Sequence, residues 1–332
     1  MNIRMKEIIA TVLIAIFFLV CYFVIKEPIQ FSPTVTYIIM IVMVLIFVLM
    51  LIRTLQGKYV QRRIVFLLIG IALLVPFFMQ FDLPIQVSDE VRGVFDGLAA
   101  LQPGSTVLVS FDYDPPSAPE LQPMAESLMK YAFEHDLKLI IMGLWPMGPQ
   151  QAQLAIEAAF LENPDWREQK IDGIDYCNLG FQSGNEFVIL RMGESIRATF
   201  PRDINGHAYD SIPLVRNVSN FTNIDYSINL SAGKPGTIEW VQLAVDRFNL
   251  TMGAGNTAVQ APMAYPYVNS GQLVGLMGGM SGAAEFELLT EYTGKATTFL
   301  LSQSFAHVVV IGFIIIGNVA YLRDKKKKEK RS

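Results

Sequence analysis

Four long apolar segments bounded by charged residues constrain this chain more than any other feature. Each is close to the roughly 20 apolar residues that cross about 30 Å of hydrocarbon. The segments cover residues 8–25, 34–52, 64–81 and 296–322. We therefore predict an integral membrane protein that meets the lipid bilayer through four transmembrane α-helices, the first three of them within residues 1–81.

Basic residues gather on one side of these segments. They precede the first segment, fill the loop between the second and third, and follow the fourth: Arg4, Lys6, Arg53, Lys58, Arg62, Arg63, Arg323, Lys325, Lys326, Lys327, Lys328, Lys330 and Arg331. Cytoplasmic flanks of membrane helices collect Lys and Arg. Both termini, including the basic tail 323–332, are thus predicted to be cytoplasmic, and residues 82–295 extracytoplasmic. A signal peptide would also fit residues 8–25, but no small-x-small cleavage site follows Ile25.

The region between the third segment and the tail is acidic. From Ile64 to Leu322 there are 12 basic and 26 acidic residues, a net charge of about −14. Such a domain is repelled by anionic headgroups and binds nucleic acid poorly. We therefore expect no nucleic-acid partner, and basic ligands are favoured over acidic ones, although an acidic surface can serve solubility alone.

Strand-length apolar runs alternate with helical patterns through residues 82–295. The strands are expected at 106–111, 137–144, 175–180, 223–230 and near 252–259. Strands separated by helices of about ten to fifteen residues indicate right-handed crossovers and parallel pairing. We predict an exterior α/β domain with a mainly parallel, doubly wound sheet of about five strands, in a flavodoxin-like or Rossmann-like arrangement.

Loops at the carboxyl ends of these strands carry the candidate site. Ligands of doubly wound sheets bind beyond those ends, at a switch in strand order. The candidate cleft residues are Asp112, Asp114, Trp145, Asn178, Ser183 and Lys234. An enzyme is favoured if the two aspartates converge on a pocket with Asn178, Ser183 or Lys234. A scaffold is favoured if Trp145 and the proline-rich loop fill the cleft.

The Asp112-Tyr113-Asp114 sequence ends an apolar strand and resembles the first motif of the haloacid-dehalogenase phosphatases. In that family the first carboxylate is the nucleophile and both surround a magnesium ion. The resemblance covers about eight residues, Pro116 stands where the family has Thr or Val, and no Asp-Asp pair follows downstream. It implies Asp112 and Asp114 as metal ligands, so a divalent cation is the one cofactor suggested. Alternatively, both aspartates cap the turn into the next helix.

Other nucleotide and hydrolase motifs do not fit this chain. The segment Ser231–Thr237 lacks the spacing of a phosphate loop. Ser183 is not preceded by the glycine of a G-x-S-x-G elbow. The sequence thus identifies no catalytic residues.

Small residues recur at three- and four-residue spacings just before the fourth segment. We assign Gly275, Gly278, Gly279 and Gly282 to one helix, where each glycine costs roughly 1 kcal/mol relative to Ala. Close packing must offset that cost, either on the sheet of the domain or against another copy. In the fourth segment, His307 is expected to bond to the other spans or to a neighbouring subunit. A homo-oligomer or a contact with other membrane proteins is therefore expected.

From about Val91 to Leu322 the chain resembles a group of uncharacterised prokaryotic membrane proteins. The stretches that carry this resemblance are Ser110–Pro115, Glu120–Met124 and Ser270–Leu276. It implies an exterior α/β domain framed by transmembrane helices, and no known activity.

The sequence thus favours a binding, scaffold or assembly module on a membrane anchor, and it does not predict an enzyme. Two alternatives stay open. One is a membrane-anchored hydrolase or phosphate-processing enzyme that uses the strand-end cleft, and the other is a small transporter or channel subunit.

Overall fold

The computed structural model describes residues 29–329, apart from 32, 58–60, 82–84 and 293. The chain divides into two compact units. One is Met1–Pro84 together with Thr298–Ser332, called here the helical unit. The other is Ile85–Thr297, called here the α/β domain.

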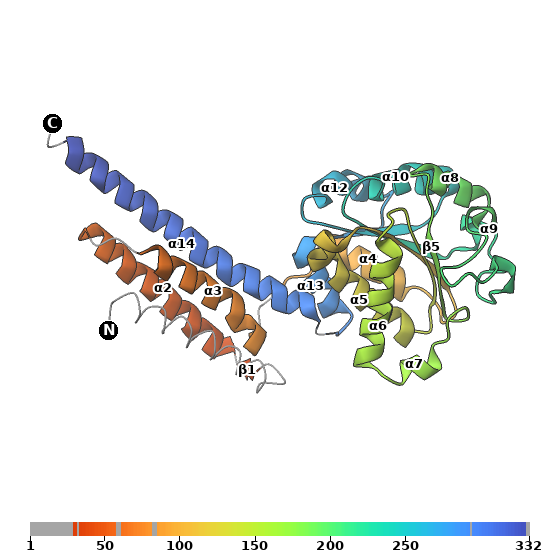
Figure 1. The fold of residues 1–332 in the computed structure, drawn as a ribbon, viewed down its shortest axis with the longest axis horizontal. Helices are drawn as coiled ribbons and strands as arrows, with labels where there is room; N and C mark the ends of the chain where they lie inside the picture. The colour runs from red at the N-terminus through yellow and green to blue at the C-terminus, as the bar shows by residue number, and fades with distance from the viewer. Residues whose placement is uncertain (1–28, 32, 58–60, 82–84, 293, 330–332) are drawn as a thin grey trace. The chain divides into compact units, whose positions relative to one another are not determined.

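A single parallel sheet forms the centre of the α/β domain (Figure 1). Its six described strands are β3 (Thr106–Asp112), β4 (Lys138–Gly143), β5 (Tyr176–Phe181), β6 (Tyr226–Ser231), β7 (Met252–Asn256) and β8 (Gly275–Gly278). They lie in the order β5-β4-β3-β6-β7-β8, and every pairing is parallel. Counted along the chain this is 3-2-1-4-5-6, the Rossmann order and not the flavodoxin order. The first three strands thus extend from β3 toward one edge of the sheet, and the last three extend from β6 toward the other edge. The switch in strand order lies between β3 and β6.

Helices cover both faces of this sheet (Figure 1). On one face lie α4 (Asp89–Ala99), α5 (Ala118–Glu134), α6 (Gly148–Glu162) and α13 (Gly279–Leu289). On the other lie α8 (Phe187–Glu194), α10 (Thr237–Trp240) and α12 (Ala261–Asn269). The shorter helices are α7 (Trp166–Gln169), α9 (Ile196–Thr199) and α11 (Asp246–Phe248), the last joined to α10 by a π-helical turn at Val241–Val245. The predicted α/β domain is confirmed.

The central strands form where the sequence is apolar on both faces. In β3 and β4 every residue after the first is buried, as expected for parallel strands covered on both sides. All five predicted strands are found. The sixth, β8, was not predicted, because it has only four residues and two of them are glycines.

The glycine run before the fourth apolar segment is divided between a strand and a helix, so its assignment to one helix is wrong. Gly275 and Gly278 belong to β8, and α13 begins at Gly279. A side chain at Gly275 would overlap the backbone of α4 at Glu90. One at Gly282 would lie 2.8 Å from the backbone of Met277. These close approaches lie within the α/β domain, and a contact with another copy of the chain stays a prediction.

Helix α13 also holds both ends of the α/β domain. Near the first end, the carboxylate of Glu285 accepts hydrogen bonds from the backbone and hydroxyl of Ser88. Near the other end, Glu287 accepts from the amides of Ala296 (2.8 Å) and Thr297 (2.9 Å). Both glutamates are buried. Each lies against the first residues of another helix, where amides without a partner in the helix attract a carboxylate.

The helical unit contains α2 (Pro33–Leu55), α3 (Arg62–Phe78), most of α14 (Lys295–Glu329) and the short paired strands β1 (Ile29–Phe31) and β2 (Met79–Phe81). Its core brings together Ala72 of α3 with Leu301, Phe305 and Val309 of α14.

Of the four predicted spans, one is found as a helix of sufficient length and hydropathy among the described residues. That helix is Lys295–Lys326. The second and third predicted spans fall on α2 and α3, whose apolar stretches Leu45–Leu55 and Ile64–Leu74 are shorter than a span. The first predicted span, 8–25, lies outside the described residues.

Candidate functional site

Asp112 occupies the end of β3, at the point where the strand order reverses. Its carboxylate is fully buried and accepts hydrogen bonds from four groups. These are the backbone amide of Leu144 (2.7 Å), the side-chain amide of Asn229 (2.6 Å), the indole of Trp240 (3.0 Å) and the hydroxyl of Ser110 (2.9 Å). The donors come from β3, β6, α10 and the residue that follows β4, so one carboxylate joins four segments of the domain.

The parallel register brings these polar groups to one face of the sheet. Ser110 pairs with Asn229, and Asp112 pairs with Ser231. Ser231 of β6 pairs in turn with Asn256 of β7. Side chains two residues apart on a strand share a face, so these polar residues lie side by side beneath α10.

A second layer of bonds extends from Asn229. Its side-chain oxygen accepts from the hydroxyl of Thr237 at 2.7 Å. The same hydroxyl lies 3.1 Å from the side-chain oxygen of Asn256. Thr237 and Asn256 are both buried, so the polar groups that surround Asp112 are satisfied by one another, as buried polar groups require.

Burial sets the protonation of Asp112. It raises the pKa of Asp112 from 3.8 to about 6, and hydrogen bonds led by that from Leu144 act in the opposite direction. Leu144, Asn229 and Trp240 offer only N–H groups here, and these favour the ionised form. The carboxyl is therefore ionised at pH 7, and the four donors occupy most of the lone-pair positions of its two oxygens.

The two residues of the predicted metal pair lie at the end of β3 and just before the turn that follows it. Asp114 is half-buried and lies two residues after Asp112, before the short 3₁₀ turn Pro115–Ser117, and its side chain makes no capping bond there. Asp112 faces β4, β6 and α10, so it does not cap this turn either. Among the described residues no group of three or more His, Cys, Asp or Glu is arranged to hold a metal ion. A divalent cation at Asp112 and Asp114 stays a prediction.

Trp145 covers the loop that follows β6. Its indole N–H donates to the carbonyl oxygen of Pro235 at 2.8 Å. A methyl group added at Gly233 would lie 3.1 Å from the indole ring, so the ring packs directly on this loop. Lys234 extends outward, with its ammonium 4.0 Å from Glu239. Trp145 and the proline-containing loop therefore lie against each other at the strand ends.

Asn178 and Ser183 do not join Asp112. The side chain of Asn178 donates to the carbonyl of Pro149 at 3.1 Å and accepts from the amide of Gly180 at 3.0 Å. Ser183 is exposed in the loop after β5. Since β5 lies two strands from β3, these residues are roughly 10 Å from the Asp112 strand.

His307 lies on α14 with an exposed side chain. Its neighbour Ser302 is buried and donates to the carbonyl of Thr298 in the same helix at 3.1 Å. A bond from His307 to another span or subunit stays a prediction.

The residues that surround Asp112 were not singled out from the sequence. They are Ser110, Asn229, Thr237, Trp240 and Asn256. The signal that could have found them is the alternation in β6, where buried polar residues at every second position interrupt an otherwise apolar strand. In a strand covered on both faces, such alternation indicates a buried polar network.

No family model, curated protein or solved structure matches this chain.

Proposed function

We propose that this protein is an integral membrane protein whose extracytoplasmic α/β domain is a binding, scaffold or assembly module. Four transmembrane helices would anchor it, with both termini in the cytoplasm. Its partners would be the lipid bilayer and either further copies of itself or other membrane proteins.

The membrane location is supported by the apolar helix Lys295–Lys326 and by the surface of the helical unit. Large apolar side chains on this unit are exposed, among them Leu49, Phe66, Ile311 and Ile314. Exposed apolar surface of this extent is typical of a protein or lipid contact. The guanidinium of Arg323 donates to the carbonyl of Thr54, which agrees with a shared cytoplasmic side for the tail and the loop after α2.

The observation that carries the binding or scaffold role is that the carboxylate of Asp112 is hydrogen-bonded by groups of its own domain. In a doubly wound sheet the switch point is the usual place for a ligand and for catalytic groups. Here the acidic group at that point is enclosed by donors from its own domain. The strand-end hydrolase is therefore the less favoured proposal, and a binding role would use another surface.

Cysteine accessibility tests the proposed topology. Asn205 is exposed on the α/β domain, and Lys326 is exposed at the end of α14. A membrane-impermeant thiol reagent on intact cells should label Asn205→Cys and leave Lys326→Cys unlabelled until the cells are lysed. The unsubstituted chain is the control, since its one described cysteine, Cys177, is buried. Preferential labelling of Lys326→Cys in intact cells would overturn the proposal.

A further inference from the structure

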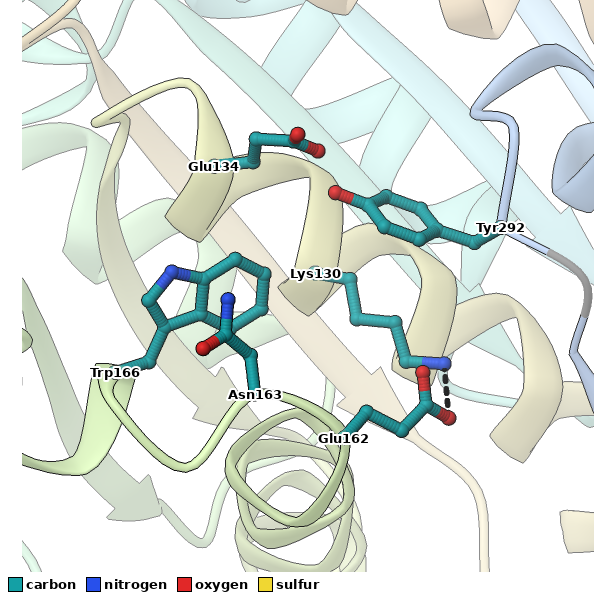
Figure 2. A pocket seen from close by; sticks show the side chains of 6 residues that line it. All are labelled: Lys130, Glu134, Glu162, Asn163, Trp166 and Tyr292. Carbon is teal, nitrogen blue, oxygen red and sulfur yellow. Dashed lines mark hydrogen bonds and ion pairs between the residues drawn. The ribbon is translucent and has the colours of Figure 1, made fainter.

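A pocket of about 200 Å³ lies on the α/β domain, away from the strand ends (Figure 2). It is formed by the last turns of α5 and α6, the start of α7 and the segment after α13. The residues that line it are Lys130, Glu134, Glu162, Asn163, Trp166 and Tyr292. None of the candidate residues predicted from the sequence belongs to it.

The pocket is lined by one basic and two acidic side chains. The ammonium of Lys130 is paired with the carboxylate of Glu162 at 2.6 Å, and the Lys130 side chain is only 2% exposed. That ammonium also lies 5.9 Å from the ring centre of Tyr292. Lys130 and Glu162 thus neutralise each other in the pocket wall, and the exposed Glu134 gives the pocket a net negative charge.

The hydroxyl of Tyr292 is the second notable feature. Its oxygen is buried and has no hydrogen-bond partner among the described residues. Figure 2 shows the hydroxyl end of the ring on the Glu134 side of the pocket, away from the Lys130–Glu162 pair. An unmatched buried hydroxyl is costly, and this oxygen is closed off from the pocket, so the Tyr292 ring forms part of the pocket wall.

We propose that this pocket binds a small organic cation that carries a primary ammonium group. The ammonium would donate to the exposed carboxylate of Glu134. The indole of Trp166 is the aromatic ring that attracts cations most strongly, and the amide oxygen of Asn163 offers a further acceptor. An anion would face the carboxylate of Glu134, and the acidic domain as a whole raises the local concentration of cations.

This inference names a ligand class for the binding role proposed above, and it rests on that role alone. It does not depend on the membrane topology or on Asp112. Failure of the binding test below would therefore leave the result of cysteine labelling unchanged.

Isothermal titration of the full chain in non-ionic detergent, at low ionic strength, tests the proposal. The probe is cadaverine, and 1,5-pentanediol is its neutral counterpart of the same length. Cadaverine should bind and pentanediol should not. Glu134→Gln should weaken cadaverine binding roughly tenfold or more, because it removes a charged acceptor.

A matched control distinguishes binding in this pocket from nonspecific attraction of cations to the acidic domain. Glu194 is an exposed carboxylate at the end of α8, outside the pocket. Glu194→Gln removes the same charge from the domain and should leave the affinity for cadaverine unchanged. The proposal is overturned if cadaverine does not bind, if pentanediol binds equally well, or if Glu134→Gln and Glu194→Gln have the same effect.

Discussion

Replacement of Asp112 by alanine gives the most direct test of the buried polar network. The change removes the acceptor of three N–H groups, those of Leu144, Asn229 and Trp240. Each buried donor left without a partner costs about 1–3 kcal/mol, so the three together cost about 6 kcal/mol. The loss is partly offset, because the variant no longer has to bury a charge.

The size of this offset follows from the pKa of Asp112. Its pKa is raised from 3.8 to about 6 in the folded chain, and a shift of about two units corresponds to roughly 3 kcal/mol. A raised folded-state pKa means that the native chain binds the proton more tightly than the unfolded chain. This contribution to stability is fully present below about pH 3.8 and is lost as the pH rises through 6. Asp112→Ala should therefore reduce the unfolding free energy by about 3 kcal/mol at pH 7 and by about 6 kcal/mol near pH 4.

Tryptophan fluorescence of the full chain in detergent can follow the unfolding. Trp145, Trp166 and Trp240 are the three tryptophans of the sequence and all lie in the α/β domain. A loss of about 3 kcal/mol would lower the melting temperature by about 6–12 °C for a domain of this size. Asp114→Ala is the control, since its half-buried side chain makes no capping bond, and it should change stability by less than about 0.5 kcal/mol at either pH.

Two results would refute this reasoning. One is an Asp112→Ala variant that melts at the same temperature as the unsubstituted chain at pH 7. A catalytic carboxylate can often be removed at no cost to stability, so that result would restore the strand-end enzyme. The other is a larger loss of stability at pH 7 than at pH 4, which would show that the native state stabilises the charged carboxylate and lowers its pKa.

Two further predictions concern packing around α13. Gly275→Ala should destabilise the domain by about 1–3 kcal/mol, because the new methyl group overlaps the backbone of α4. Gly278→Ala should cost less than about 1 kcal/mol, since its nearest neighbour is a methyl group at 3.2 Å; equal melting temperatures for the two variants would contradict this contrast. Glu287→Gln should speed hydrogen exchange at the amides of Ala296 and Thr297, because both amides donate hydrogen bonds to the Glu287 carboxylate in the unsubstituted chain. The exposed Glu291→Gln should not, and unchanged exchange in Glu287→Gln would show that the carboxylate does not hold this helix start.

The class of the domain could be predicted from the sequence because β3 and β4 contain runs that are apolar on both faces. A run such as Val107–Val109 has no polar side for water, so it must be covered on both faces. The strand β8 gives no such signal, since it has only four residues and its Gly275 lets α4 approach the sheet. Strand order could not be predicted, because it depends on contacts between segments that are far apart in the chain.

The candidate site could be predicted only as a position. Asp112 was placed correctly at the end of a strand, but its partners Asn229 and Trp240 lie more than a hundred residues later. Which loop meets which strand end follows from the order of strands, so the sequence could not show that the carboxylate is enclosed. The pocket next to Trp166 was missed for a similar reason, since three helices and the segment after α13 form it.

The attachment of both domain ends to α13 bears on how such a protein can arise. Ser88 and Thr297 are bound by glutamates only two residues apart on one helix. A domain that begins and ends at one place can be inserted into a loop of another protein without separating the segments on either side. The α/β domain could therefore be inserted between two helices of another protein without separating them.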